Sequence, residues 1–399
     1  MISYQEALKI ITQNTKCLDV ERVEISQIRD RILAENIIAD IDLPPFDRSQ
    51  MDGFAVISDD TENAPVTLNI IGESAAGKGW DGEIKPGETV RIMTGGRIPQ
   101  GATAVQKVEL TRENGDSVEI LEPTKINQNI VRQAAELEKG TQVFATGDKV
   151  NAATIASLAS FGYAYAKVSK RPKINILATG NEIVEINQTP KKDQIRNSNS
   201  MTIKSYAEIC GGIAEILPNV SDDLSTLKPQ ISNAVNSCEI LILSGGVSVG
   251  KYDFTKTALR ELGAKIYFEK VALRPGKPIV FAKLNETLIF GLPGNPVSVA
   301  VTFCLFVRTA ILLMQNAEEF ELKSNFAVIS EQMKGVEGRD SFLPAKLSNS
   351  KQGLLKIELV KWGGSSDFVS FAKADALVFV PRGEILKADS VAKFYYLPN

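Results

Sequence analysis

The chain has 399 residues, 44% of them hydrophobic and 23% charged, and its 45 basic and 48 acidic side chains give a net charge of −3. This composition is typical of a soluble protein of two to four domains, and it argues against a nucleic-acid groove or a polybasic membrane surface. Histidine is absent from the sequence. That excludes imidazole acid–base chemistry, Ser-His and Cys-His triads and the usual zinc sites, and leaves carboxylates, Lys, Arg, hydroxyls, backbone N–H groups or a hard metal ion.

The first 171 residues predict a β-rich domain inserted into a helical one. Ser3 and Glu6 are spaced as a capping box, and the helical pattern over residues 3–40 predicts a second helix from Ser26. Short β-type runs such as VTLNIIG, ETVRIMTGG and SVEIL then alternate with turn residues, and helical pattern returns at residues 151–162. We therefore expect a helical domain from residues 1–43 and 139–171, with a β-rich domain at 44–138.

From residue 172 onward, apolar strands alternate with helical segments, a rhythm that predicts a parallel α/β sheet covered on both faces over residues 172–320. Residues 321–399 are rich in β-type runs and predict a small β-barrel domain. The apolar segment Pro296–Gln315 is long enough to span a membrane, but Arg308 lies inside it and favours a buried core helix. The start of the chain lacks the pattern of a signal peptide. The scattered cysteines Cys17, Cys210, Cys238 and Cys304 are typical of free thiols in a reducing cytoplasm.

Four loops of the predicted α/β domain follow strands and are rich in glycine: ATGNE, SGGVSVGKYD, RPGKP and LPGNPVS. Ligands bind at the carboxyl ends of strands in such sheets, where glycines expose backbone N–H groups to anions. Together with nearby cations, these loops predict a polyanion site that includes Gly245, Gly246, Ser248, Gly250, Lys270, Arg274 and Lys277. The sequence lacks a G-x-x-x-x-G-K-[ST] phosphate loop and a clean G-x-G-x-x-G, which disfavours ATPases and nicotinamide enzymes.

Three carboxylates, Glu182, Asp222 and Asp253, also follow strand ends. If these three carboxylates converge on one pocket, they would suit Mg²⁺, which is commonly bound by protein carboxylates together with substrate phosphates. Taken singly, each is more often a helix cap or a solvated acid. Earlier in the chain, Asp52 and Thr94 stand in the loops FDRSQMDGFA and RIMTGGRIP, which alone would be a domain-junction turn and a hairpin bend.

These stretches together resemble the MoeA/gephyrin family, the molybdopterin molybdenumtransferases of molybdenum cofactor biosynthesis. The motifs FDRSQMDGFA, RIMTGGRIP, ATGNEI, SGGVSVGKYDFTK, RPGKP and GLPGNPVS occur in the order of that family. The resemblance implies four domains, including a MogA-like three-layer α/β domain and a C-terminal β-barrel domain, in a cytoplasmic homodimer. It also implies a reaction in which molybdate is inserted into adenylylated molybdopterin with Mg²⁺, releasing AMP.

Site residues follow from the matching motifs. The resemblance implies catalytic roles for Asp52, Glu182, Asp222 and Asp253, with Glu182 and Asp253 on the metal. It implies substrate binding by Thr94, Gly245, Gly246, Ser248, Gly250, Lys270, Arg274, Lys277 and Ser365. Asp52 and Thr94 would reach the cleft of the partner subunit. The partners that it implies are a MogA-like adenylyltransferase and molybdoenzyme maturation proteins, with no nucleic acid and no membrane.

The sequence departs from the family pattern at several positions. Asn181 replaces a common Asp, Arg274 a common Lys, and Pro344 a common second Arg, whereas Arg339 is retained. The segment 130–137 lacks the usual Arg-rich form, and Glu136 is a loose counterpart of its Asp. Two alternatives remain open: a molybdopterin adenylyltransferase or CinA-like nucleotide pyrophosphate enzyme, and a gephyrin-like scaffold that binds a peptide.

Overall fold

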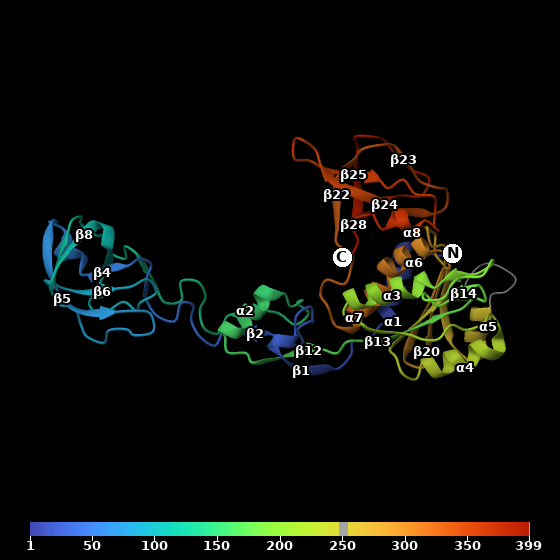
Figure 1. Ribbon diagram of the computed structural model, residues 1–399, viewed down its shortest axis with the longest axis horizontal. Coiled ribbons are helices and arrows are strands. Elements are labelled where there is room, and N and C mark those ends of the chain that lie inside the picture. The colour runs from blue at the N-terminus through green and yellow to red at the C-terminus, as the bar shows by residue number, and fades with distance from the viewer. Residues whose placement is uncertain (247–253, 399) are drawn as a thin grey trace. The chain divides into compact units, whose positions relative to one another are not determined.

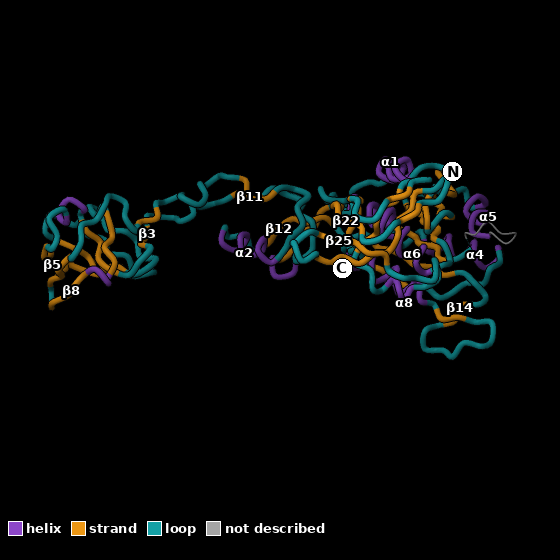
Figure 2. Tube along the Cα trace, turned by 90° about the horizontal axis from the view of Figure 1, so that it is seen from above, coloured by secondary structure: helices purple, strands orange, loops and turns teal. Residues whose placement is uncertain are grey.

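The chain forms two compact units in the computed structural model, which describes residues 1–246 and 254–398 (Figures 1 and 2). The main unit contains Met1–Glu35, Thr146–Ala152 and Tyr165–Asn399. The inserted unit contains Asn36–Ala145 and Ala153–Ala164. The chain therefore leaves the main unit twice and returns to it twice.

The inserted unit is built on a six-stranded sheet of order β7-β4-β6-β5-β9-β8. Its strands are β4 (Gly53–Val56), β5 (Val66–Ser74), β6 (Glu88–Ile92), β7 (Ala104–Lys107), β8 (Thr111–Asn114) and β9 (Ser117–Ile120). Phe54, Leu68 and Val118 form part of a core on one face of the sheet. Two short antiparallel ladders join β3 (Arg48–Ser49) to β10 (Ile130–Val131) and β2 (Ile37–Ile38) to β11 (Gln142–Phe144). The helix α2 (Ala152–Ser160) follows, as the helical pattern over 151–162 predicts.

The prediction of helix over residues 3–40 is wrong beyond the first helix. Helix α1 (Tyr4–Asn14) begins as predicted, because the Ser3 side chain accepts a hydrogen bond from the Glu6 backbone N–H at 3.1 Å. The next element is strand β1 (Val20–Glu24), which pairs antiparallel with β12 (Tyr165–Ser169), and residues Ile25–Gln27 form a single 3-10 turn. Pairing with a strand about 145 residues away overrides the local helical pattern.

The α/β domain has a six-stranded sheet of order β16-β13-β17-β21-β20-β18. The strands are β13 (Lys173–Ala178), β16 (Ile213–Ile216), β17 (Ile240–Ser244), β18 (Lys265–Lys270), β20 (Pro278–Leu284) and β21 (Thr287–Leu292). The first three and β21 are mutually parallel, but β20 is antiparallel to both β21 and β18. A fully parallel sheet was the wrong expectation, because Asn285 and Glu286 alone connect β20 to β21 and a parallel crossover needs about a dozen residues.

Helices cover both faces of this sheet (Figure 1). One face packs against α1, α3 (Ser198–Ile209) and the long helix formed by α6 (Pro296–Thr302), a π-helical turn (Phe303–Val307) and α7 (Arg308–Met314). The other face packs against α4 (Leu224–Ala234) and α5 (Phe254–Glu261). The Pro296–Met314 helix is apolar and long enough to span a membrane, but it is mostly buried inside the protein. As predicted, it is a core helix.

A closed five-stranded barrel follows, which confirms the prediction for the C-terminal region. Its strands are β22 (Ser324–Ile329), β24 (Asp340–Asn349), β25 (Leu355–Leu359), β26 (Ala376–Val380) and β28 (Val391–Tyr396). The ring closes because β24 pairs with both β25 and β26. Strand β19 (Leu273–Arg274) leaves the α/β domain to pair with β24, and Tyr4 of α1 packs on Phe342 of β24 with ring centroids 5.0 Å apart. The barrel is thus joined to the α/β domain by backbone and side-chain contacts.

Candidate functional site

Loops at one edge of the α/β sheet enclose a cavity of about 1160 Å³. Glu182 follows β13, Gly245 and Gly246 follow β17, and Asp222 precedes α4. All four residues line the cavity, as do side chains from α3 and from the C-terminal domain. Because the parallel strands β13, β17 and β21 end at the same edge, residues far apart in sequence meet there, as the sequence predicts.

The turn after β17 requires glycine at two consecutive positions. Gly245 and Gly246 have φ angles of 91° and 64°, and a Cβ atom on Gly245 would lie 2.4 Å from the Thr179 carbonyl oxygen. A Cβ on Gly246 would lie 2.6 Å from Thr255 Oγ1 and 2.8 Å from Thr179 Oγ1. Both threonine hydroxyls are buried and lack a well-formed hydrogen bond among the described residues. They are therefore available to a ligand that reaches the glycine turn.

The acidic side of this cavity carries Asp222 and Glu182. Burial raises the pKa of the Asp222 carboxyl, the Thr179 hydroxyl lowers it in part without completing a well-formed hydrogen bond, and the Glu182 carboxylate raises it further. Two neighbouring carboxylates suit Mg²⁺, which takes one or two protein carboxylates and completes its shell with water and phosphate oxygens. Within residues 1–246 and 254–398, no cluster of three or more Asp, Glu or Cys side chains suited to a metal ion occurs.

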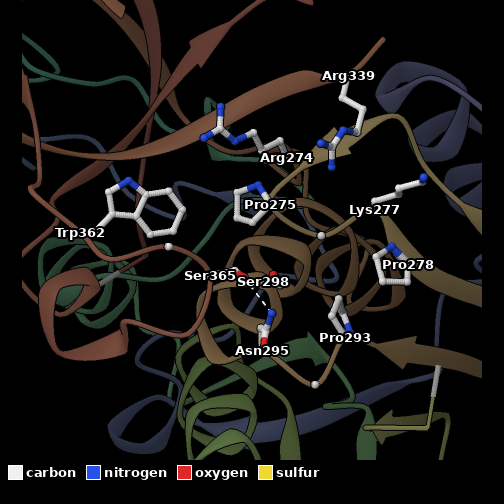
Figure 3. Close-up of a pocket in the computed structure, with 13 residues that line it drawn as sticks. Arg274, Pro275, Lys277, Pro278, Pro293, Asn295, Ser298, Arg339, Trp362 and Ser365 are labelled. Carbon is white, nitrogen blue, oxygen red and sulfur yellow. Dashed lines mark hydrogen bonds between the residues drawn. The ribbon is translucent and has the colours of Figure 1, made fainter. Parts of the chain in front are cut away.

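A second cavity, of about 760 Å³, lies beside the first and is basic. Arg274, Lys277 and Arg339 line it, and within the described part of the chain none of the three forms an ion pair (Figure 3). Arg274 and Arg339 lie on one side of the cavity, whereas Asn295 and Ser298 lie on the other. Cations gathered without acidic partners create a positive potential that attracts a small anion.

The C-terminal domain supplies part of this basic cavity. The Asn295 amide Nδ2 donates to Ser365 Oγ at 2.8 Å, and the Val297 backbone N–H donates to the Ser365 carbonyl at 3.0 Å. Pairing of β19 with β24 brings Arg274 next to the start of β24, which directly follows Arg339. There, Asp340 is buried and accepts hydrogen bonds from Arg382. These contacts fix the positions of two arginines and a serine that come from different domains.

The two cavities adjoin, because Pro278, Pro293, Gly294 and Asn295 line both, and we treat them together as the candidate cleft. One end of the cleft is basic and the other carries the carboxylates and the glycine turn. Gly276 allows the RPGKP loop to pack closely on α6: its φ is 104°, and a Cβ there would lie 2.4 Å from Thr302 Cγ2. The cleft therefore suits an extended ligand with anionic groups at more than one point.

Asp52 and Thr94 belong to the inserted unit, where they bind each other. The Thr94 backbone N–H and hydroxyl both donate to Asp52 Oδ1, at 2.6 and 2.8 Å, and these bonds lower the pKa of the exposed Asp52 carboxyl. In the same unit, Arg48 donates to Glu136 at 3.3 Å, so the altered segment 130–137 still carries an ion pair to the FDRSQMDGFA loop.

Of the remaining predicted residues, some line the basic cavity, one lines neither cavity, and three lie outside the described part of the chain. Lys277, Arg274 and Ser365 line the basic cavity, but Lys270 lines neither cavity, although it ends β18 at the same edge. Asp253, Ser248 and Gly250 lie outside the described residues. Pro344, which stands where the family commonly has a second Arg, is buried within β24 and lines neither cavity. Its presence therefore removes no cation from the cleft that the described residues form.

The cavity residues Asn295, Ser298 and Trp362 were not named as site residues from the sequence, and Arg339 was noted only as a retained cation of the family pattern. The motif GLPGNPVS contains the first two and gave a signal, because a helix that begins after a glycine loop favours anions. Trp362 gave no such signal. Its loop reaches the cavity through barrel connections that no local pattern shows.

Comparisons with known proteins cover the chain almost completely. Family models match residues 2–162 (MoeA N-terminal region, domain I and II), 175–312 (probable molybdopterin binding domain) and 327–395 (MoeA C-terminal region, domain IV). A protein of Bacillus subtilis named molybdopterin molybdenumtransferase is 35% identical over 390 residues, covering 96% of this chain and 90% of the relative. A protein of the same name from Haemophilus influenzae is 33% identical, with 97% and 96% covered.

Solved structures agree with these sequence matches. The crystal structure of the molybdopterin biosynthesis moeA protein from Pyrococcus horikoshii OT3 is 27% identical, with a TM-score of 0.86 over 99% of this chain and all of that one. A second structure of a moeA protein from Pyrococcus horikoshii is 29% identical, with a TM-score of 0.84 over the whole of both chains. By sequence along its whole length and by fold, the chain belongs to the MoeA family.

Proposed function

We propose that this protein is a molybdopterin molybdenumtransferase, which inserts molybdate into adenylylated molybdopterin and releases AMP. The observation that carries the proposal is a basic cavity that adjoins a second cavity lined by a glycine turn and two carboxylates. A substrate that carries a pyrophosphate and reacts with an oxyanion needs both ends. The curated relatives bear the name of this activity.

The basic cavity is the proposed molybdate site. Arg274, Lys277 and Arg339 offset the charge of a dianion, and the hydroxyls of Ser298 and Ser365 are hydrogen-bond donors on the same cavity. Charge-assisted hydrogen bonds of this kind contribute roughly 1.5–3 kcal/mol each. Because the site includes residues of two domains, molybdate binding would also stabilise their contact.

The carboxylate end is the proposed site of the pyrophosphate linkage. Glu182 and Asp222 would hold Mg²⁺, with Asp253 as the further carboxylate that the family resemblance implies. When bound, the ion would neutralise charge on the phosphates and make AMP a better leaving group. The backbone N–H groups of the Gly245–Gly246 turn and the hydroxyls of Thr179 and Thr255 would orient the phosphate oxygens.

We infer further that the protein works in the cytoplasm as a homodimer in which Asp52 and Thr94 serve the partner's cleft. This inference rests on the family resemblance, as do the MogA-like adenylyltransferase and the molybdoenzyme maturation proteins as partners. Mixing Asp52→Ala chains with Asp222→Ala chains should restore one working cleft in each heterodimer. Verified heterodimers that stay as inactive as both parents would refute the shared site.

The proposed activity is tested by incubating the protein with adenylylated molybdopterin, molybdate and Mg²⁺, and measuring both AMP release and active cofactor. At limiting molybdate, Arg339→Gln should lower the activity, whereas Arg29→Gln, which removes a surface cation of the main unit, should keep it. Absence of molybdenum insertion by the wild-type protein would refute the proposal. Adenylylation of molybdopterin instead would favour the adenylyltransferase alternative.

A further inference from the structure

The loop that carries two cations of the basic cavity runs beside the very beginning of the chain. This loop, residues 271–277, connects β18 to β20 and contains Arg274 and Lys277 (Figure 3). A hydrogen bond from the Val271 N–H to the Lys277 carbonyl, at 3.1 Å, closes it. Ile2 pairs with Val271 as a parallel bridge at its base. We call residues 271–277 the basic loop.

Two backbone hydrogen bonds join Ile2 to this region. The Ile2 N–H donates to the Lys270 carbonyl at 3.4 Å, and the Ile2 carbonyl accepts from the Ala272 N–H at 2.8 Å. The Ala272 carbonyl in turn accepts from the Asp340 N–H of β24 at 2.9 Å. Both backbone groups of Ala272 are therefore used, one by the start of the chain and one by the C-terminal domain. Because Ala272 is buried, water cannot readily replace either bond.

The side chain of Ile2 anchors this contact. The first residues of a chain are commonly poorly ordered unless other contacts tie them down. Here Met1 is exposed, but Ile2 is partly buried and packs against the main core of the α/β domain. Helix α1 begins two residues later, and its Tyr4 packs on Phe342 of β24. The contact of Ile2 with the basic loop is thus fixed by an apolar side chain on one side and by a docked helix on the other.

The basic loop needs such support if its cations are to bind an anion well. Arg274 lies two residues after Ala272, so its place at the cavity depends on the backbone that Ile2 holds. If a loop adopts its binding conformation only part of the time, the affinity for the ligand falls by that fraction. Ile2 lines neither of the two cavities that the described residues form. Any effect of Ile2 on binding must therefore pass through the loop.

We propose that Ile2 is a positioning residue for the basic cavity, whose backbone bonds hold the basic loop so that Arg274 and Lys277 face a bound oxyanion. The identity of that oxyanion, molybdate, rests on the proposed function. Because Ile2 touches no substrate, its loss raises the KM for molybdate. The kcat at saturating molybdate stays, since the anion itself then selects the binding conformation of the loop.

The test measures molybdate binding by calorimetry at low salt on full-length variants. Ile2→Gly removes the anchoring side chain and makes the backbone more flexible, and it should weaken binding at least about fivefold. Ile2→Val keeps a branched apolar side chain and should bind as wild type does. The control is Ser3→Ala, which removes the side chain that caps α1 and leaves the bonds of Ile2 in place. Ser3→Ala should melt lower than wild type and bind molybdate equally well.

A second measurement follows the loop without any ligand. Amide hydrogen exchange over residues 270–277, read by mass spectrometry, should be faster in Ile2→Gly than in wild type and unchanged in Ser3→Ala. If Ile2→Gly melts near the assay temperature, Ile2→Ala is the milder substitute. Unchanged exchange, unchanged affinity, or an equal loss of affinity in Ser3→Ala would each overturn the proposal.

The two proposals fail in different ways. Wild-type protein that binds no molybdate would refute the molybdate site, and the positioning role of Ile2 with it. Wild-type protein that binds molybdate no better than Ile2→Gly would refute the positioning role alone and leave the site standing.

Discussion

The ion pair between Asp340 and Arg382 predicts an unequal effect of removing its two members. The Asp340 carboxylate is buried and accepts from the Arg382 backbone N (3.2 Å), Nε (3.3 Å) and Nη2 (3.2 Å). The side chain of Asp340 is 5% exposed, whereas that of Arg382 is 48% exposed. Losing the guanidinium leaves a charge buried without its cation, but losing the carboxylate leaves a cation that water can reach.

The exposures rank the two effects, and typical magnitudes for such groups give their size. Arg382→Met removes both side-chain donors and keeps one backbone N–H, so the free energy of unfolding should fall by about 3–5 kcal/mol. Asp340→Asn keeps an acceptor for that N–H and removes only the charge, so the free energy of unfolding should fall by about 1–2 kcal/mol. Adding Asp340→Asn to Arg382→Met removes the uncompensated carboxylate. The double variant should therefore be more stable than Arg382→Met alone.

Urea unfolding followed by tryptophan fluorescence measures these differences. The chain has two tryptophans, Trp80 in the inserted unit and Trp362 in the C-terminal domain, so a Trp80→Phe background makes the signal report the region of the pair. The decisive comparison is the double variant against Arg382→Met. Equal stability of the two would show that the Asp340 carboxylate does not need its cation, and the reasoning would be wrong.

Three further predictions concern the charged groups of the two units. Arg339→Gln should weaken molybdate binding about tenfold at low salt, the loss of roughly 1.5 kcal/mol, and less in 1 M salt; calorimetry with equal affinities would contradict this. Because burial raises the pKa of Asp222, its charge opposes folding, and stability falls as pH rises through the folded pKa. Asp222→Asn should therefore melt no lower than wild type at pH 7 yet lose Mg²⁺-dependent turnover, and a lower melting temperature would refute the assignment. Thr94→Val removes one of the two bonds that lower the pKa of Asp52, so that pKa should rise in a carbon NMR titration, and an unchanged value would show that the backbone N–H suffices.

Much of the acidic end of the cleft was predictable from the sequence. Glu182 and Gly245 each follow an apolar run that reads as a buried strand, and parallel strands bring their carboxyl ends to one edge. The apolar pattern of each strand can be seen in a short segment of sequence, and the meeting of strand ends at one edge is a general property of parallel sheets. Residues placed by this rule line the cavity. Lys270 follows the same rule and yet lines neither cavity, because a strand end fixes the position of a backbone and not the direction of a long side chain.

The basic end was less predictable, because it depends on contacts between domains. Arg339 and Trp362 reach the cavity through the closure of the barrel and the pairing of β19 with β24. Helical periodicity failed at Val20–Glu24 for a related reason. That segment has an acceptable helical pattern, but its strand partner lies at Tyr165–Ser169, and pairing over that separation is invisible in a local window.

The position of α1 has a consequence for how the chain folds during synthesis. Tyr4 packs against Phe306 and Phe342, with ring centroids 5.8 and 5.0 Å apart. At about 5–20 residues per second, a ribosome needs roughly 17–70 s to pass from the first of these residues to the last. An isolated helix of 11 residues is marginal in water over that time. The inserted unit, complete at Ala164, has all its residues before the first strand of the α/β sheet is made, so the beginning of the chain is among the last parts to reach its native contacts.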